Sequence, residues 1–135
     1  ADNVQLLEEY LITGKNAGRL NLKFRMSGSE KILLHGHCHQ KALTGTGPAI
    51  EVVRRTGANI VDLDGGCCGM AGSFGYVRDH LDVSLAIGER VLAPAVREHQ
   101  GPVLAPGFSC RHQVEHLTGT RPLSTAEWLA GRLES

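Results

Sequence analysis

Three short strand-like segments, separated by stretches with helical spacing, restrict the fold of this sequence more than any other feature. The segments are residues 31–37, 59–64 and 102–105. Runs of this length between glycine- and proline-containing turns are typical of strands. Strands that alternate with helices along a chain usually form a parallel sheet with helices on its faces. We therefore predict an α/β protein.

The stretches around these strands carry helix signals. Residues 48–56 begin with a proline and end before a glycine, and Pro94 is expected to kink or divide a helix over 79–98. Ser124 and Glu127 form a capping-box pattern that opens a last helix. Two further helices are predicted, at 3–13 and from a cap at Ser109 to Gly119, with 14–30 as a connecting loop.

The predicted fold class is thus a small parallel sheet of about three or four strands flanked by helices, in a Rossmann-like three-layer architecture. Residues 1–30 are expected to form an N-terminal helix and linker, and residues 31–135 a cysteine-rich domain. The chain does not begin with Met, and we expect it to be a fragment of a longer multidomain protein.

Charge and hydropathy exclude several classes of partner. Lys plus Arg and Asp plus Glu both number 14, without a basic stripe, so the sequence does not predict nucleic-acid binding. Its apolar runs are all shorter than the roughly 18 residues of a membrane span. Four cysteines without a secretory signal favour a cytoplasmic setting, where such thiols are more often metal-bound or catalytic than disulfide-bonded.

The positions of the cysteines are the strongest functional signal. Cys38 follows the first predicted strand, Cys67 and Cys68 follow the second, and Cys110 follows the third. The carboxyl ends of parallel strands meet at one edge of a sheet, where ligands bind. We therefore predict that the four thiols converge there as metal ligands, although free cysteines are also common as small buried apolar residues.

The turn around Cys67 and Cys68 has an unusual composition. Glycines recur at every third position, and Gly66 and Gly69 flank the two cysteines. Glycine lets backbone N–H groups approach and hydrogen-bond to metal-bound sulfur. Adjacent cysteines do not match the C-x2–4-C spacing of structural zinc sites. They can reach different irons of one cluster, or form a vicinal disulfide.

Histidines surround the first cysteine. His35, His37 and His39 alternate with Cys38, so strand periodicity points all three away from it. Beyond the end of the strand, His37 or His39 can turn inward as a ligand or as a hydrogen-bond partner of the site. For each of them we favour the plainer interpretation of a polar residue bonded to backbone or water.

Other polar residues lie near the cysteines in the sequence. His112, two residues after Cys110, is a candidate to hydrogen-bond to the site or to add a ligand. Asp62 and Asp64 flank the end of the second strand and are interpreted as a solvated turn. His80, His99 and His116 are interpreted as surface residues.

Three motifs together resemble a known family. They are His37-Cys38-His39, the turn GCCGMAGSFGY and the later GFSCRHQ. This combination resembles the cysteine-rich CCG domain of heterodisulfide reductase subunits and of the iron–sulfur subunits of glycolate oxidase and anaerobic glycerol-3-phosphate dehydrogenase. The sequence is most similar to the C-terminal part of FAD-linked oxidases of the D-lactate or 2-hydroxyglutarate dehydrogenase type, over residues 5–130.

The resemblance implies an electron-transfer module of an FAD-linked oxidoreductase that acts on a 2-hydroxy acid such as D-lactate or glycolate. It implies a 4Fe–4S-type iron–sulfur cluster held by Cys38, Cys67, Cys68 and Cys110, with FAD in an upstream domain. The expected partners are upstream ferredoxin-like and flavin domains. Two further points stay open: peripheral attachment to the inner membrane through the parent enzyme, and association with a second copy of the chain. The isolated chain is not expected to be an active enzyme.

The sequence departs from the family pattern at its end. The family motif closes with C-x-x-C, whereas Cys110 is followed by Arg111, His112 and Gln113. This departure argues against a five-cysteine noncubane cluster and leaves open a site with four thiolates, helped by a histidine or by water. Two alternatives stay open: a zinc-binding structural or assembly module, and a thiol–disulfide redox site at Cys67 and Cys68.

Overall fold

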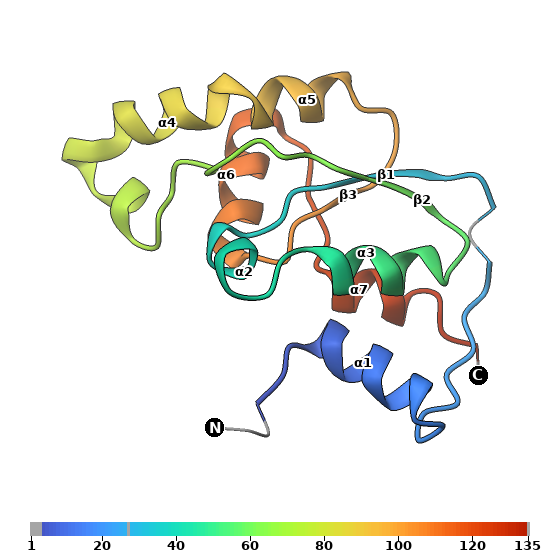
Figure 1. Cartoon of the computed structure of the whole chain (residues 1–135). Helices are drawn as coiled ribbons and strands as arrows, with labels where there is room; N and C mark the ends of the chain where they lie inside the picture. The colour runs from blue at the N-terminus through green and yellow to red at the C-terminus, as the bar shows by residue number, and fades with distance from the viewer. Residues whose placement is uncertain (1–3, 27, 135) are drawn as a thin grey trace.

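A computed structural model describes residues 4–26 and 28–134, and a parallel sheet of order β2-β1-β3 forms its centre (Figure 1). The strands are β1 (Lys31–Leu34), β2 (Asn59–Asp62) and β3 (Val103–Leu104). Lys31 is in register with Asn59, and Leu33 with Val103. The predicted α/β class is therefore confirmed, with each strand shorter than predicted.

Helices cover both faces of the sheet. In Figure 1, α4, α5 and α6 lie on one side, and α3 and α7 on the other with α1 beyond them. The bounds are α1 Leu7–Asn16, α2 Cys38–Leu43, α3 Gly47–Arg54, η1 Phe74–Tyr76, η2 Arg78–His80, α4 Leu81–Arg90, α5 Leu92–Glu98, α6 Phe108–Thr118 and α7 Thr125–Ala130. In the part of the chain that the structure describes, no helix is long and apolar enough to cross a membrane.

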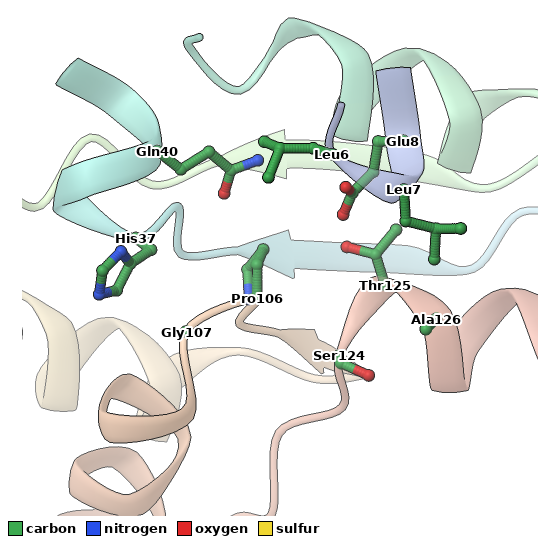
Figure 2. A pocket seen from close by; sticks show the side chains of 10 residues that line it. All are labelled: Leu6, Leu7, Glu8, His37, Gln40, Pro106, Gly107, Ser124, Thr125 and Ala126. Carbon is green, nitrogen blue, oxygen red and sulfur yellow. The ribbon is translucent and has the colours of Figure 1, made fainter. Parts of the chain in front are cut away.

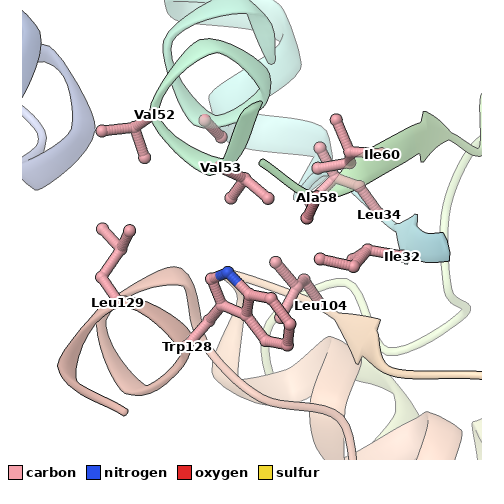
Figure 3. Packing of buried hydrophobic residues seen from close by; sticks show 10 residues of the cluster. Ile32, Leu34, Val52, Val53, Ala58, Ile60, Leu104, Trp128 and Leu129 are labelled. Atoms are coloured by element: carbon pink, nitrogen blue, oxygen red, sulfur yellow. The ribbon is translucent and has the colours of Figure 1, made fainter. Parts of the chain in front are cut away.

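The two-residue period of β1 divides the core into two layers. Ile32 and Leu34 face α3 and α7, where Trp128 fills much of the space (Figure 3). Leu33 points to the opposite face and packs in the cluster that contains Leu92 from α5. Each layer buries aliphatic side chains almost completely, which stabilises the fold by removing apolar surface from water. The face of Leu33 is also the face that carries the buried cysteines.

The first helix is shifted toward the C-terminus of the chain relative to its prediction at 3–13. Residue 3 lies outside the described residues, and 4–6 are not helical. The Glu9 carboxylate accepts the Leu6 backbone N–H at 2.9 Å, which fixes the start of α1 at Leu7. The helix continues through Gly14, which packs closely against Leu20, so the predicted loop begins only after Asn16.

Three boundaries in the rest of the chain also differ from prediction. Residues 38–43 form α2, which is not among the predicted helices. The helix predicted over 79–98 is divided at Val91, so that Pro94 falls in the first turn of α5, where its missing N–H breaks no helical hydrogen bond. Gly107, not Ser109, is the N-cap of α6, although Gly119 ends that helix in the left-handed conformation as predicted. The capping box of Ser124 and Glu127 is confirmed.

Candidate metal centre

The carboxyl ends of β1 and β3 form the edge of the sheet at which the chain changes direction. β1 connects to β2 through α2 and α3, and β3 lies on the other side of β1 after α4 and α5. The two connections cover opposite faces, so a crevice opens beyond β1 and β3. Doubly wound sheets bind their ligands at such switch points. The segments that carry Cys38 and Cys110 both start here.

Two of the predicted ligands form a buried pair. Cys68 and Cys110 are 3% and 2% exposed and share a hydrogen bond. The Cys110 thiol lowers the pKa of Cys68 to about 4, helped by the nearby His35 and the Met70 N–H and opposed by burial. The same hydrogen bond raises the pKa of Cys110, and burial and the negative charge of Cys68 raise it further. The pair therefore holds one proton and one negative charge at neutral pH.

This shared proton predicts an unusual titration of the metal-free chain. One thiolate should persist down to about pH 4, well below the pKa of roughly 8.5 of a free cysteine. The ultraviolet absorbance of thiolate measures it directly. In Cys110→Ala the stabilising donor is gone, so the pKa of Cys68 should rise and the absorbance at mildly acidic pH should disappear. A wild-type chain without thiolate absorbance in that range would contradict the pairing.

His35 completes a group of three possible ligands with this pair. A ring nitrogen of His35 and the two sulfur atoms all lie within 4.8 Å of one another. His35 is 1% exposed, and neither ring nitrogen meets hydrogen-bond geometry with any described residue. Its nearest polar neighbour is the Cys68 sulfur, whose thiolate form it stabilises. The plainer interpretation of His35, as a residue bonded to backbone or water, finds no such backbone partner here.

Cys38 and Cys67 lie at the more open side of the same region. Cys38 is the first residue of α2 and is exposed, whereas Cys67 is half-buried. Both are close enough to Cys110 to raise its pKa by repulsion. The Gly69 N–H donates to the sulfur of Cys67 at 3.3 Å. Cys38 and Cys67 thus lie near the buried pair of Cys68 and Cys110. That all four cysteines bind one metal group stays a prediction.

The glycine turn is fixed in place from α4 and α6. Gly69 has a φ of +98°, and a Cβ there would collide with the backbone oxygen of Ser84. The buried Gln113 amide donates to the carbonyls of Cys68 at 3.1 Å and Ser84 at 3.0 Å. Gly66 also has a positive φ, but a side chain there would meet open space. Gln113 is therefore a positioning residue that the sequence did not single out.

The remaining predicted histidines take different positions. The His37 ring packs on Gly107, whose Cα region also lies against the sulfur of Cys110. His39 is exposed and stacks on His37 with ring centroids 6.3 Å apart. The Nδ1 atom of His112 lies 3.0 Å from the Tyr76 hydroxyl. His37 is thus next to the buried pair, while His112 is engaged with Tyr76, and the roles of all three near a metal stay predictions.

Residues interpreted as solvated also have partners. Asp62 accepts a hydrogen bond from Thr46 at 2.6 Å, and Asp64 pairs with Lys41 at 3.4 Å. His116 is exposed as expected, whereas His80 and His99 are half-buried.

Comparisons with known proteins give relatives among dehydrogenases. The chain is 33% identical over 120 residues to D-2-hydroxyglutarate dehydrogenase of Pantoea ananatis, an alignment that covers 87% of this chain and 11% of that protein. It is 36% identical over 88 residues to D-2-hydroxyglutarate dehydrogenase of Escherichia coli, covering 63% of this chain and 9% of that protein. It is 28% identical over 92 residues to one subunit of the anaerobic glycerol-3-phosphate dehydrogenase of Escherichia coli, covering 67% of this chain and 23% of that subunit.

The chain therefore spans about a tenth of the length of the D-2-hydroxyglutarate dehydrogenases that it matches. No family model matches the chain, and no solved structure matches it at a significant level. The similarity thus relates one domain-sized region to dehydrogenases that are much longer.

Proposed function

We propose that this chain is an electron-transfer module of an oxidoreductase, and that it binds a 4Fe–4S-type iron–sulfur cluster through Cys38, Cys67, Cys68 and Cys110. The observation that carries the proposal is the buried group of Cys68, Cys110 and His35, whose sulfur and nitrogen atoms all lie within 4.8 Å of one another. Relatives that are named as dehydrogenases support a redox setting for this site.

The residues present fit such a group. Thiolates are the usual ligands of iron–sulfur clusters, and the pair already holds a negative charge in the absence of metal. Backbone N–H groups of Gly69 and Met70 donate to the sulfurs of Cys67 and Cys68, respectively. Such bonds stabilise negative charge on sulfur and tune the reduction potential of a cluster. His35 offers a further nitrogen ligand at the buried side.

When bound, the cluster supplies one-electron acceptance and donation. The residues of the chain hold and insulate it. Cys68 and Cys110 exclude water from the inner side, because both are almost fully buried. The outer side, at exposed Cys38 and half-buried Cys67, is the side that we propose faces the electron-transfer partner.

The proposed parent enzyme oxidises a 2-hydroxy acid on FAD in an upstream domain, and electrons reach this module through ferredoxin-like domains. The named substrate of two relatives, 2-hydroxyglutarate, belongs to this class. In this proposal residues 31–135 form the cluster-binding domain and 1–30 a helix and linker. The isolated chain holds no flavin site in the proposal, so we expect no turnover from it alone.

Zinc is the second candidate, because one specific observation favours it. The set of one nitrogen and two sulfurs within 4.8 Å, with a third thiol nearby, suits a four-coordinate zinc ion. Such a site would make the chain a structural or assembly module. The third possibility, thiol–disulfide exchange at Cys67 and Cys68, has both residues as free thiols in this structure.

Anaerobic purification followed by metal and sulfide analysis separates the three. Iron with acid-labile sulfide, together with a charge-transfer absorption band that bleaches on reduction, supports the cluster. Zinc at one ion per chain, without sulfide, supports the structural site. A metal-free chain that neither iron with sulfide nor zinc can reconstitute, and whose thiols oxidise reversibly, contradicts both metal proposals.

His35 gives a separate prediction about the ligand set. If its imidazole binds the metal, pulsed EPR of the paramagnetic state should show a nitrogen coupling that changes when histidine is labelled with ¹⁵N. The coupling should vanish in His35→Leu, which keeps the core apolar, and should persist in His116→Asn, where the replaced side chain is exposed. A coupling unchanged by His35→Leu would remove His35 from the ligand set and leave the cysteines.

A further inference from the structure

A cavity of about 350 Å³ opens at the same switch point as the cysteines, on the side of α1 and α7. It lies between the start of α1, the loop before α2, the loop after β3 and the start of α7 (Figure 2). His37 and Gly107 line it, and the Cys110 sulfur lies close to Gly107 as well. The cavity is therefore adjacent to the cysteine site.

Three oxygen-bearing side chains enter this cavity from three helices. Glu8 comes from α1, Gln40 from α2 and Thr125 from α7. Figure 2 shows all three turned toward the same space in front of Pro106. Glu8 is only 7% exposed and Thr125 only 2% exposed. Residues far apart in the sequence thus place a carboxylate, an amide and a hydroxyl around one cavity.

These groups have unused hydrogen-bonding capacity. Neither Oγ1 of Thr125 nor Oε1 of Gln40 has a hydrogen-bond partner among the described residues. Among the residues that the structure describes, no lysine or arginine lines the cavity beside the Glu8 carboxylate. Buried acceptors without donors are unfavourable, and a carboxylate attracts a cation. A bound group that carries positive charge and several N–H donors would pair with Glu8 and satisfy the two acceptors.

The rest of the lining is apolar. Leu6, Leu7, Pro106 and Ala126 form the walls beside the three polar groups. An aliphatic stem that ends in a cation matches this division, because its carbons cover apolar surface while its head reaches the oxygens. An anionic ligand would be repelled by the Glu8 carboxylate, and a purely apolar ligand would leave the three polar groups without a partner.

We propose that this cavity binds an alkyl cation, an alkylguanidinium or alkylammonium group, with Glu8 as its counter-ion and Thr125 and Gln40 as acceptors. Its source is a free small molecule or the side chain of an arginine or lysine. The site needs no metal, so the inference is independent of the proposed function of the cysteines.

Calorimetric titration of the chain with butylguanidinium, butylammonium and butanol tests the proposal. The two cations should bind saturably, and butanol at least about tenfold more weakly, because it lacks the charge that pairs with Glu8. Glu8→Gln keeps the shape of the side chain and should weaken butylguanidinium binding by a similar factor. Glu98→Gln removes an exposed carboxylate at the end of α5 and should leave binding unchanged.

Further arms keep the test decisive. If Glu8→Gln does not fold by circular dichroism, Thr125→Val removes an unpartnered acceptor instead and should weaken binding several-fold. N-acetyl-arginine amide distinguishes the sources: binding as tight as that of butylguanidinium indicates a protein side chain, and much weaker binding indicates a free small cation. Absence of saturable cation binding to the wild-type chain, or equal effects of the variants at Glu8 and Glu98, would overturn the proposal.

Discussion

Replacement of Cys68 or Cys110 by serine is expected to abolish metal loading of this chain. These two sulfurs are the most deeply buried of the four cysteine sulfurs, and their shared proton leaves a thiolate ready for a metal. A serine hydroxyl stays protonated and is a poor ligand for iron or zinc in this setting. We expect bound metal to fall at least about tenfold, more than the loss typical of a supporting residue. Metal and sulfide content per chain after anaerobic reconstitution measure the effect.

A loss of metal must be separated from a loss of folding. Val114 is a suitable control, because it lies one turn after Cys110 in α6 and is fully buried in the same cluster. Val114→Ala should destabilise the fold by roughly 1–3 kcal/mol through lost packing and still load metal. If Cys110→Ser loads as much metal as the wild type, or Val114→Ala loses as much as Cys110→Ser, the assignment of the pair as ligands is wrong.

The sheet could be predicted from the sequence because its signals are local. A short strand such as β1 needs only a short apolar run between turns, and three such strands that alternate with helices predict an α/β class. The nearness of Cys68 to Cys110 follows from the same information, since parallel strands bring their carboxyl ends together. Helix boundaries were less accurate, because a capping contact such as Glu9 to Leu6 decides them and depends on a single side chain.

His35 shows where this reasoning stops. Strand periodicity compares a residue only with its neighbours in the same strand, and on that basis His35 points away from Cys38. The same period puts His35 on the face of Leu33, which is the face where Cys68 and Cys110 are buried. That coincidence depends on which helices cover which face. The sequence therefore indicates the face on which His35 lies, but only the packing of the helices shows that Cys68 and Cys110 lie on the same face.

The glycines of the CCG turn also have roles that their spacing in the sequence does not predict. Gly66, Gly69 and Gly72 recur at equal intervals and all have positive φ. Cβ atoms at Gly66 and Gly72 would meet open space, whereas one at Gly69 would enter the backbone of α4. Equal spacing in the sequence therefore conceals unequal roles, and the contact with α4 separates them.

Gly69→Ala is accordingly expected to be among the most damaging single substitutions in this chain. The new methyl group meets the Ser84 carbonyl oxygen, which belongs to a helix backbone and cannot rotate away. The φ of +98° adds strain for any residue with a side chain. Backbone strain and overpacking each contribute about 1–3 kcal/mol, so the free energy of unfolding should fall by roughly 3 kcal/mol or more. Chemical denaturation of the metal-free chain, followed by circular dichroism, measures it.

Gly66→Ala provides the matched control for this substitution. It adds the same methyl group in the same turn at a similarly positive φ of +74°, but with open space around it. Only the left-handed backbone penalty of about 1–2 kcal/mol applies there. Because Gln113 ties the Cys68 carbonyl to Ser84, displacement of Gly69 should also shift Cys68 and lower metal content, while Gly66→Ala should still load metal. Equal losses of stability and of metal in the two variants would mean that the contact between the turn and α4 does not position the site.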